Sequence, residues 1–174
     1  MKLYRAKVAA IAHDVIELLL NDHDVEIRAE NRAEAEKDLV AIMEEFLRRD
    51  NDFRNQVRDH MASRNMPFDQ YGQARKQIAE GSGHPLGEDI ERFLCRQFVE
   101  NLMITPNVEE VFEEDKAIYK KVMGVLRSHD VNEQEIRDEA STKIKNVKEG
   151  TVDYEIALQN AVRDVKKRRG LLER

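Results

Sequence analysis

The chain has 174 residues, of which 41% are apolar and 37% are charged, and its formal net charge is −6. A chain of this length can bury a core without disulfides, and Cys95, its only cysteine, excludes an internal disulfide. The acidic charge divides evenly between residues 1–83 and residues 84–174, so neither half is a basic nucleic-acid arm.

The first half of the chain is predicted to form four helices. Apolar residues recur every three or four positions over residues 3–20 and again over residues 35–47, which is the period of one helix face. Polar residues at Asn51 and Asp52 are typical of a helix start, so they predict a break and a third helix. Asp69 begins a fourth helix. The Gly- and Pro-rich stretch 80–87 then separates the two halves.

The second half is predicted to repeat this plan. Four further apolar stripes cover residues 90–102, 108–126, 136–147 and 154–165. Asn132 with Glu135 forms a capping box, and Thr151 is an N-cap. Asp24–Arg28 is the only candidate strand. The sequence therefore predicts an all-α protein of about eight helices in two related four-helix halves.

Two pairs of segments suggest that the halves arose by internal duplication. "LRRDNDFRNQVRD" at residues 47–59 shares four identities with "LRSHDVNEQEIRD" at residues 126–138. "VIELLLNDHDVE" at residues 15–26 shares four with "FVENLMITPNVE" at residues 98–109. Chance similarity between amphipathic helices is the alternative, but two blocks in the same order favour duplication. We therefore expect a unit over residues 1–83 and a second over residues 84–174, packed together.

Several of these segments resemble a known family. They are the opening Met1-x-Leu3 before an apolar helix, "LRSHD" followed by "IRDEASTKIKN", and the ending "EGTVDYEIALQNAVRDVKKRRGL". Across nearly the whole chain this pattern is similar to the two-unit form of the bacterial "domain of unknown function 507" family. The resemblance implies a small cytoplasmic helical protein, and it implies no activity and no functional residues.

The sequence contains no catalytic or metal-binding signature. Glu-x-x-His, His-Glu-x-x-His, a Cys pair and Gly-x-Ser-x-Gly are all absent, so we expect no enzymatic activity, metal or cofactor. The acidic cluster Asp22-His23-Asp24 is interpreted as a solvated helix end. Cys95 lies between the apolar stripe positions Phe93 and Phe98, so it is interpreted as a small buried residue.

The C-terminal helix ends in a dense group of cations that could contact phosphates. Its members are Arg163, Lys166, Lys167, Arg168 and Arg169. The alternative, which we favour, is that they complement the helix dipole and keep the protein soluble.

Two Arg-Asp pairs occupy matching places in the proposed repeat. Arg58-Asp59 and Arg137-Asp138 each lie beside an apolar stripe, where an ion pair commonly ties one helix to its neighbour. We interpret these four residues as structural ion pairs between helices.

These observations favour a non-catalytic interaction or scaffolding protein that acts through its helix faces. We expect a protein partner, which could be a second copy of the chain. The alternative is an accessory factor that binds RNA or the ribosome through the basic C-terminal helix. No apolar run is long enough to cross a membrane, so a cytoplasmic location is expected.

Overall fold

The computed structural model describes residues 1–145 and 147–172, most of which are helical, and these residues contain one small two-stranded sheet. The all-α class is therefore confirmed. Within these residues lie seven α-helices: α1 Arg5–Asn21, α2 Arg32–Ser63, α3 Tyr71–Ser82, α4 Asp89–Ile104, α5 Asp115–Ser128, α6 Glu133–Ser141 and α7 Val152–Arg168. The shorter elements are strands β1 Val25–Glu26 and β2 Glu110–Val111, and the 3-10 helices η1 Ala29–Asn31 and η2 Phe68–Gln70.

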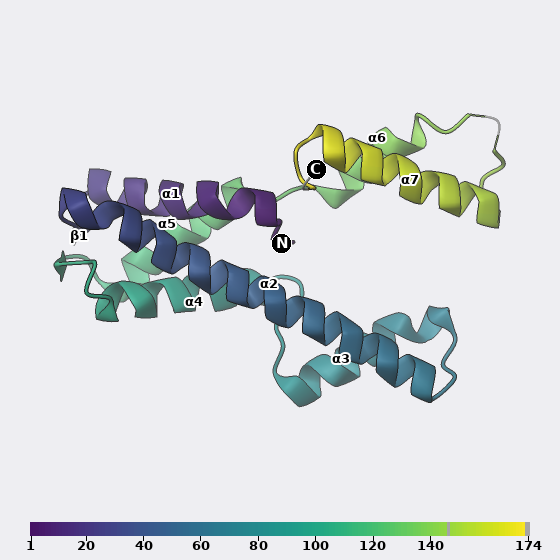
Figure 1. Ribbon diagram of the computed structural model, residues 1–174, viewed down its shortest axis with the longest axis horizontal. Helices are drawn as coiled ribbons and strands as arrows, with labels where there is room; N and C mark the ends of the chain where they lie inside the picture. Colours follow the sequence, from purple (N-terminus) through teal and green to yellow (C-terminus); the bar gives the residue numbers. More distant parts are fainter. Residues whose placement is uncertain (146, 173–174) are drawn as a thin grey trace.

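Four helices form a bundle that contains most of the buried apolar residues. Figure 1 shows α1, the first half of α2, α4 and α5 lying side by side. Phe98, Ile16 and Leu39 are among the fully buried side chains of this core, which takes residues from both sides of the expected boundary at residue 83. The bundle is thus the region where apolar burial contributes most to stability.

The predicted break at Asn51–Asp52 is wrong, because α2 continues through it as a single helix of 32 residues. Phe46, Phe53 and Val57 keep the helical spacing across these polar residues, so the buried face is uninterrupted. Two predicted helices therefore merge, and the described residues contain seven α-helices instead of about eight.

The predicted helix over residues 108–126 is also wrong at its start, because α5 begins only at Asp115. The preceding residues form β2, which pairs antiparallel with β1 and places Val25 opposite Val111. Backbone hydrogen bonds of 2.8 Å from Glu109 and Phe112 extend this pairing. The strand thus satisfies backbone groups that a helix would have paired internally. The other strand, β1, lies within the predicted candidate strand at residues 24–28.

Two helical arms extend from the same end of the bundle (Figure 1). The second half of α2 packs against α3 around Phe53 and Val57, and α6 packs against α7 around Ile136 and Val165. Tyr4, which precedes α1, is part of the core of the α6–α7 hairpin.

The two arms are built differently, so the expected duplication of four-helix halves is not supported. The first half supplies α1, α2 and α3, whereas the second supplies α4 to α7 and ends in a separate hairpin. No helix in the described part of the chain is both long and apolar enough to cross a membrane.

Candidate functional site

His84 lies at a site that the sequence analysis did not find, in the linker between α3 and α4. Gly83 ends α3 in the left-handed conformation, with φ of 67°, which glycine adopts without strain and which turns the chain back towards α2. Opposite the linker, Phe46, Asp50 and Phe53 are spaced i, i+4 and i+7, so they share one face of α2. The imidazole of His84 fills the gap between the two phenyl rings.

The His84 side chain is fixed on three sides and is only 9% exposed. Its ring stacks on Phe53, with centroids 4.3 Å apart, and on Phe46, with centroids 5.8 Å apart. Its Nε2 lies 3.2 Å from Oδ1 of Asp50, whose carboxylate also accepts a hydrogen bond from Arg54. Asp50 is itself buried, so this network satisfies a polar group inside an otherwise apolar face.

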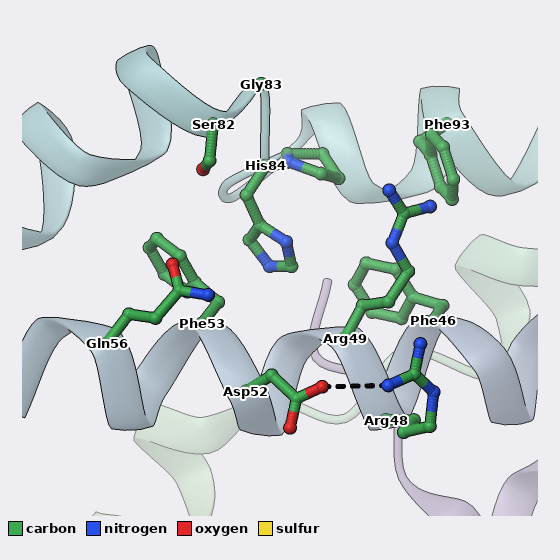
Figure 2. Close-up of a pocket in the computed structure, with 11 residues that line it drawn as sticks. Phe46, Arg48, Arg49, Asp52, Phe53, Gln56, Ser82, Gly83, His84 and Phe93 are labelled. Carbon is green, nitrogen blue, oxygen red and sulfur yellow. Dashed lines mark hydrogen bonds and ion pairs between the residues drawn. The ribbon is translucent and has the colours of Figure 1, made fainter.

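A pocket of about 300 Å³ lies beside this histidine, between α2, the linker and Phe93 of α4 (Figure 2). Arg48 and Arg49 lie at one side of it. Arg48 is engaged by Glu45 and Asp52, at distances of 2.8 and 2.9 Å. Arg49 makes no ion pair with any described residue, and Figure 2 shows its guanidinium extending towards Phe93. The pocket therefore combines aromatic walls with one arginine that forms no close ion pair among the described residues.

Three of the five C-terminal cations are neutralised by carboxylates of α6. The Nζ of Lys166 lies 2.7 Å from Glu133, while Arg168 and Arg169 both pair with Glu139. These contacts hold α7 against α6. Three of the five cations that the sequence analysis named as possible phosphate contacts are therefore engaged within the hairpin.

The ion pair between Lys166 and Glu133 is reinforced by Tyr4, whose hydroxyl donates to the same carboxylate. Burial opposes the charge on Lys166, but hydrogen bonds to Glu133 and Tyr4 outweigh it and raise the pKa of the lysine. Burial likewise opposes the charge on Glu133, but hydrogen bonds from Lys166 and Tyr4 lower the pKa of that carboxyl. The cluster joins the hairpin to the segment before α1.

The outer face of α7, opposite α6, carries the two remaining cations. Arg163 and Lys167 make no hydrogen bond or ion pair with the described residues, and helical spacing places both in one stripe with Val152 and Ile156. Val152 is 75% exposed and Ile156 is 54% exposed. This surface, hereafter the outer face of α7, therefore has an apolar end and a cationic end.

The four residues expected to form ion pairs between helices differ in their contacts. Arg137 of α6 lies 3.7 Å from Glu155 of α7 and links the two helices. Asp138 accepts a hydrogen bond from a glutamine one turn earlier in α6. Arg58 and Asp59 are exposed on α2 and contact no charged partner among the described residues. The expected link between α2 and a neighbouring helix is therefore not found in that part of the chain.

The surroundings of Cys95 and of the acidic cluster Asp22-His23-Asp24 indicate structural roles for both. Cys95 is fully buried, and burial together with nearby Glu91 raises the pKa of its thiol to about 12, which keeps it protonated. Asp22 and Asp24 lie 2.7 and 2.6 Å from Lys121 of α5, so the cluster ties β1 to that helix. No three side chains able to bind a metal are grouped within residues 1–145 and 147–172.

Comparison with known protein families identifies the family of the chain. The family described as "Protein of unknown function (DUF507)" matches residues 1–171. No curated protein matches the chain.

Proposed function

Because the chain belongs to the DUF507 family, whose description assigns no activity, we propose a function from its surface. The protein is a non-catalytic interaction module, and the outer face of α7 binds an acidic amphipathic segment of a partner protein. A cytoplasmic location is part of this proposal, supported by the single unpaired cysteine, Cys95.

The observation that carries the proposal is the pairing of exposed apolar side chains with unneutralised cations on one helix face. Ile156 and Arg163 are two helical turns apart, which is about 10 Å along the axis. A partner helix with apolar residues at one end and carboxylates two turns away would match both parts of the surface. Burial of Val152 and Ile156 would supply affinity, and the cations would set the orientation.

Binding of RNA or the ribosome is the less favoured alternative. Lys166, Arg168 and Arg169 are already paired with carboxylates, which leaves only two free cations on this helix within the described residues. No aromatic side chain lies in the stripe with these cations, whereas surfaces for single-stranded nucleic acid usually stack bases on aromatic rings.

Photo-crosslinking tests the proposal in the cells that make the protein. A photoreactive phenylalanine analogue replaces Ile156, and a matched control carries it at Lys120, an exposed position on α5 of the bundle. We expect a protein adduct from position 156 that is absent from position 120. Its yield should fall sharply when Arg163→Glu and Lys167→Glu are added.

The chemistry of the adduct separates the alternatives. An adduct removed by ribonuclease would contradict the protein-binding proposal and favour the RNA alternative. An adduct of twice the chain's mass would identify the partner as a second copy. If charge reversal leaves the yield unchanged, the cations play no part and the proposed acidic partner is wrong.

A further inference from the structure

The His84 pocket contains a polar atom that the fold itself does not use. The Nε2 atom of His84 is held by Asp50, whereas Nδ1 has no hydrogen-bond partner among the described residues. The ring cannot turn freely, because it is stacked between Phe46 and Phe53. His84 is nine-tenths buried and lines the pocket, so its ring is part of the wall of a ligand-sized space. The Nδ1 atom can accept a hydrogen bond or, when the ring is protonated, donate one.

Arg49 supplies the second polar contact of the pocket. Its neighbour Arg48 is already held by two carboxylates, so the two arginines have different electrostatic environments. The guanidinium of Arg49 forms no close ion pair in the described part of the chain, although it acts electrostatically on Glu45, and it extends over the pocket towards Phe93 (Figure 2). An arginine in this position can form two parallel hydrogen bonds to a carboxylate or phosphate.

The aromatic walls of the pocket indicate which apolar group a ligand would carry besides its polar atoms. Phe46, Phe53 and Phe93 all line it, and the rings of Phe46 and Phe93 are 5.9 Å apart and tilted by 40°. Such walls favour a flat apolar group, because aromatic faces stack on planar rings. A volume of about 300 Å³ is at the small end of the range for small-molecule sites.

We propose that this pocket binds a small molecule that combines a planar ring with an anionic group. The anionic group contacts Arg49, and the ring lies among the phenylalanines with a polar edge near Nδ1 of His84. Aromatic carboxylates and nucleoside monophosphates share this chemistry. The site is on α2, the linker and α4, so it is independent of the outer face of α7.

Isothermal titration calorimetry on the full chain tests the site with four probes. Benzoate and AMP each carry a ring and an anionic group, inorganic phosphate lacks the ring, and benzyl alcohol lacks the charge. We expect saturable binding of benzoate or AMP at one site, with the preferred probe showing which anion is recognised. Inorganic phosphate and benzyl alcohol should bind at least about tenfold more weakly.

Two substitutions locate the binding to this pocket. Arg49→Gln should weaken binding at least about tenfold, because it removes the charge from an exposed side chain without disturbing the core. The matched control is Arg92→Gln on α4, whose arginine is already paired with Asp89 at 2.9 Å, and it should leave affinity within about twofold. His84→Phe keeps the ring stack but removes Nδ1, and it should also weaken binding.

The proposal is overturned if neither benzoate nor AMP binds saturably. It is also overturned if Arg49→Gln binds as tightly as the unchanged protein, or if inorganic phosphate or benzyl alcohol binds as tightly as whichever of benzoate and AMP binds better. Arg49 is exposed, so this comparison decides the matter even if His84→Phe does not fold.

Discussion

The four-helix bundle and the α6–α7 hairpin bury very different amounts of apolar surface. Among the described residues, the bundle core contains 21 buried residues, whereas the hairpin core contains six, of which Tyr4 comes from the segment before α1. The hairpin compensates with ion pairs between its helices, at Glu133, Glu139 and Glu155. One region is therefore held mainly by packing, and the other depends on a few polar contacts around a small core.

The two regions also differ in how much of their helix surface is covered. On the bundle, Arg92 pairs with Asp89 of the same helix. In the hairpin, α7 packs only through the face that meets α6, so its opposite face stays open. The proposed partner surface is on this open face of α7.

The largest expected effect is in the bundle. Phe98→Ala should lower the free energy of unfolding by about 3 to 5 kcal/mol, because it leaves a cavity in the centre of the core. Chemical denaturation followed by circular dichroism measures this loss. A loss below about 1 kcal/mol would mean that the bundle core is not the main source of stability.

In the hairpin, a similar truncation should act locally. Leu158→Ala removes a buried side chain from the small hairpin core, at a cost of about 2 to 4 kcal/mol. We expect two-dimensional NMR signals of α6 and α7 to collapse while those of the bundle keep their positions. If the bundle signals collapse as well, the two regions unfold as one unit.

The α2–α3 arm offers an intermediate case, because it combines a small core with the network of Asp50. Asp50→Ala leaves His84 and Arg54 without their buried acceptor, and it should cost about 1 to 3 kcal/mol. Asp50→Asn is the matched control, since it keeps an acceptor oxygen and should cost less. Equal melting temperatures for Asp50→Ala and the unchanged protein would show that the network does not hold the linker.

Acid should loosen the hairpin before the bundle. The folded state lowers the pKa of Glu133, so the stability from this carboxylate is present above its ordinary pKa of about 4.3. That contribution is lost as the pH falls through the lower pKa that Glu133 has in the folded state. Methyl NMR of Leu158 should therefore report hairpin opening below about pH 4, whereas Leu39 in the bundle should be unaffected. Glu133→Gln should remove this pH dependence.

The smallest effects are expected at the surface ion-pair candidates. Arg137→Ala removes an exposed contact with Glu155 and should cost less than about 1 kcal/mol. Arg58→Ala should leave the melting temperature unchanged, because Arg58 has no charged partner among the described residues. A clear destabilisation by Arg58→Ala would reveal a contact that stabilises the α2–α3 arm.

The sequence predicted most of the helices from their apolar stripes, although α6 ends at Ser141, before the end of the stripe over residues 136–147. It failed at Asn51 and Asp52, because polar residues that are typical of a helix start also occur inside a long helix with a continuous buried face. It failed again before Asp115, because β2 is only two residues long and its pairing with β1 joins segments about 85 positions apart. Local periodicity does not report such long-range hydrogen bonds.

The candidate sites were predicted only in part. Arg163 and Lys167 were among five cations named as possible phosphate contacts, and the pairing of Lys166 with Glu133 could not be predicted because it depends on how α6 packs against α7. The His84 pocket was missed, although one signal was present. Asp50 interrupts the apolar spacing between Phe46 and Phe53, and an acidic residue on a buried face requires a partner.

The central claim is that α6 and α7 form an arm whose stability is separate from that of the bundle. Native-state hydrogen exchange, followed by mass spectrometry on the unchanged protein, tests this claim directly. We predict that the amides of α6 and α7 exchange together, at a lower opening free energy than those of α1, α4 and α5. A single opening free energy shared by all of these helices would contradict the account.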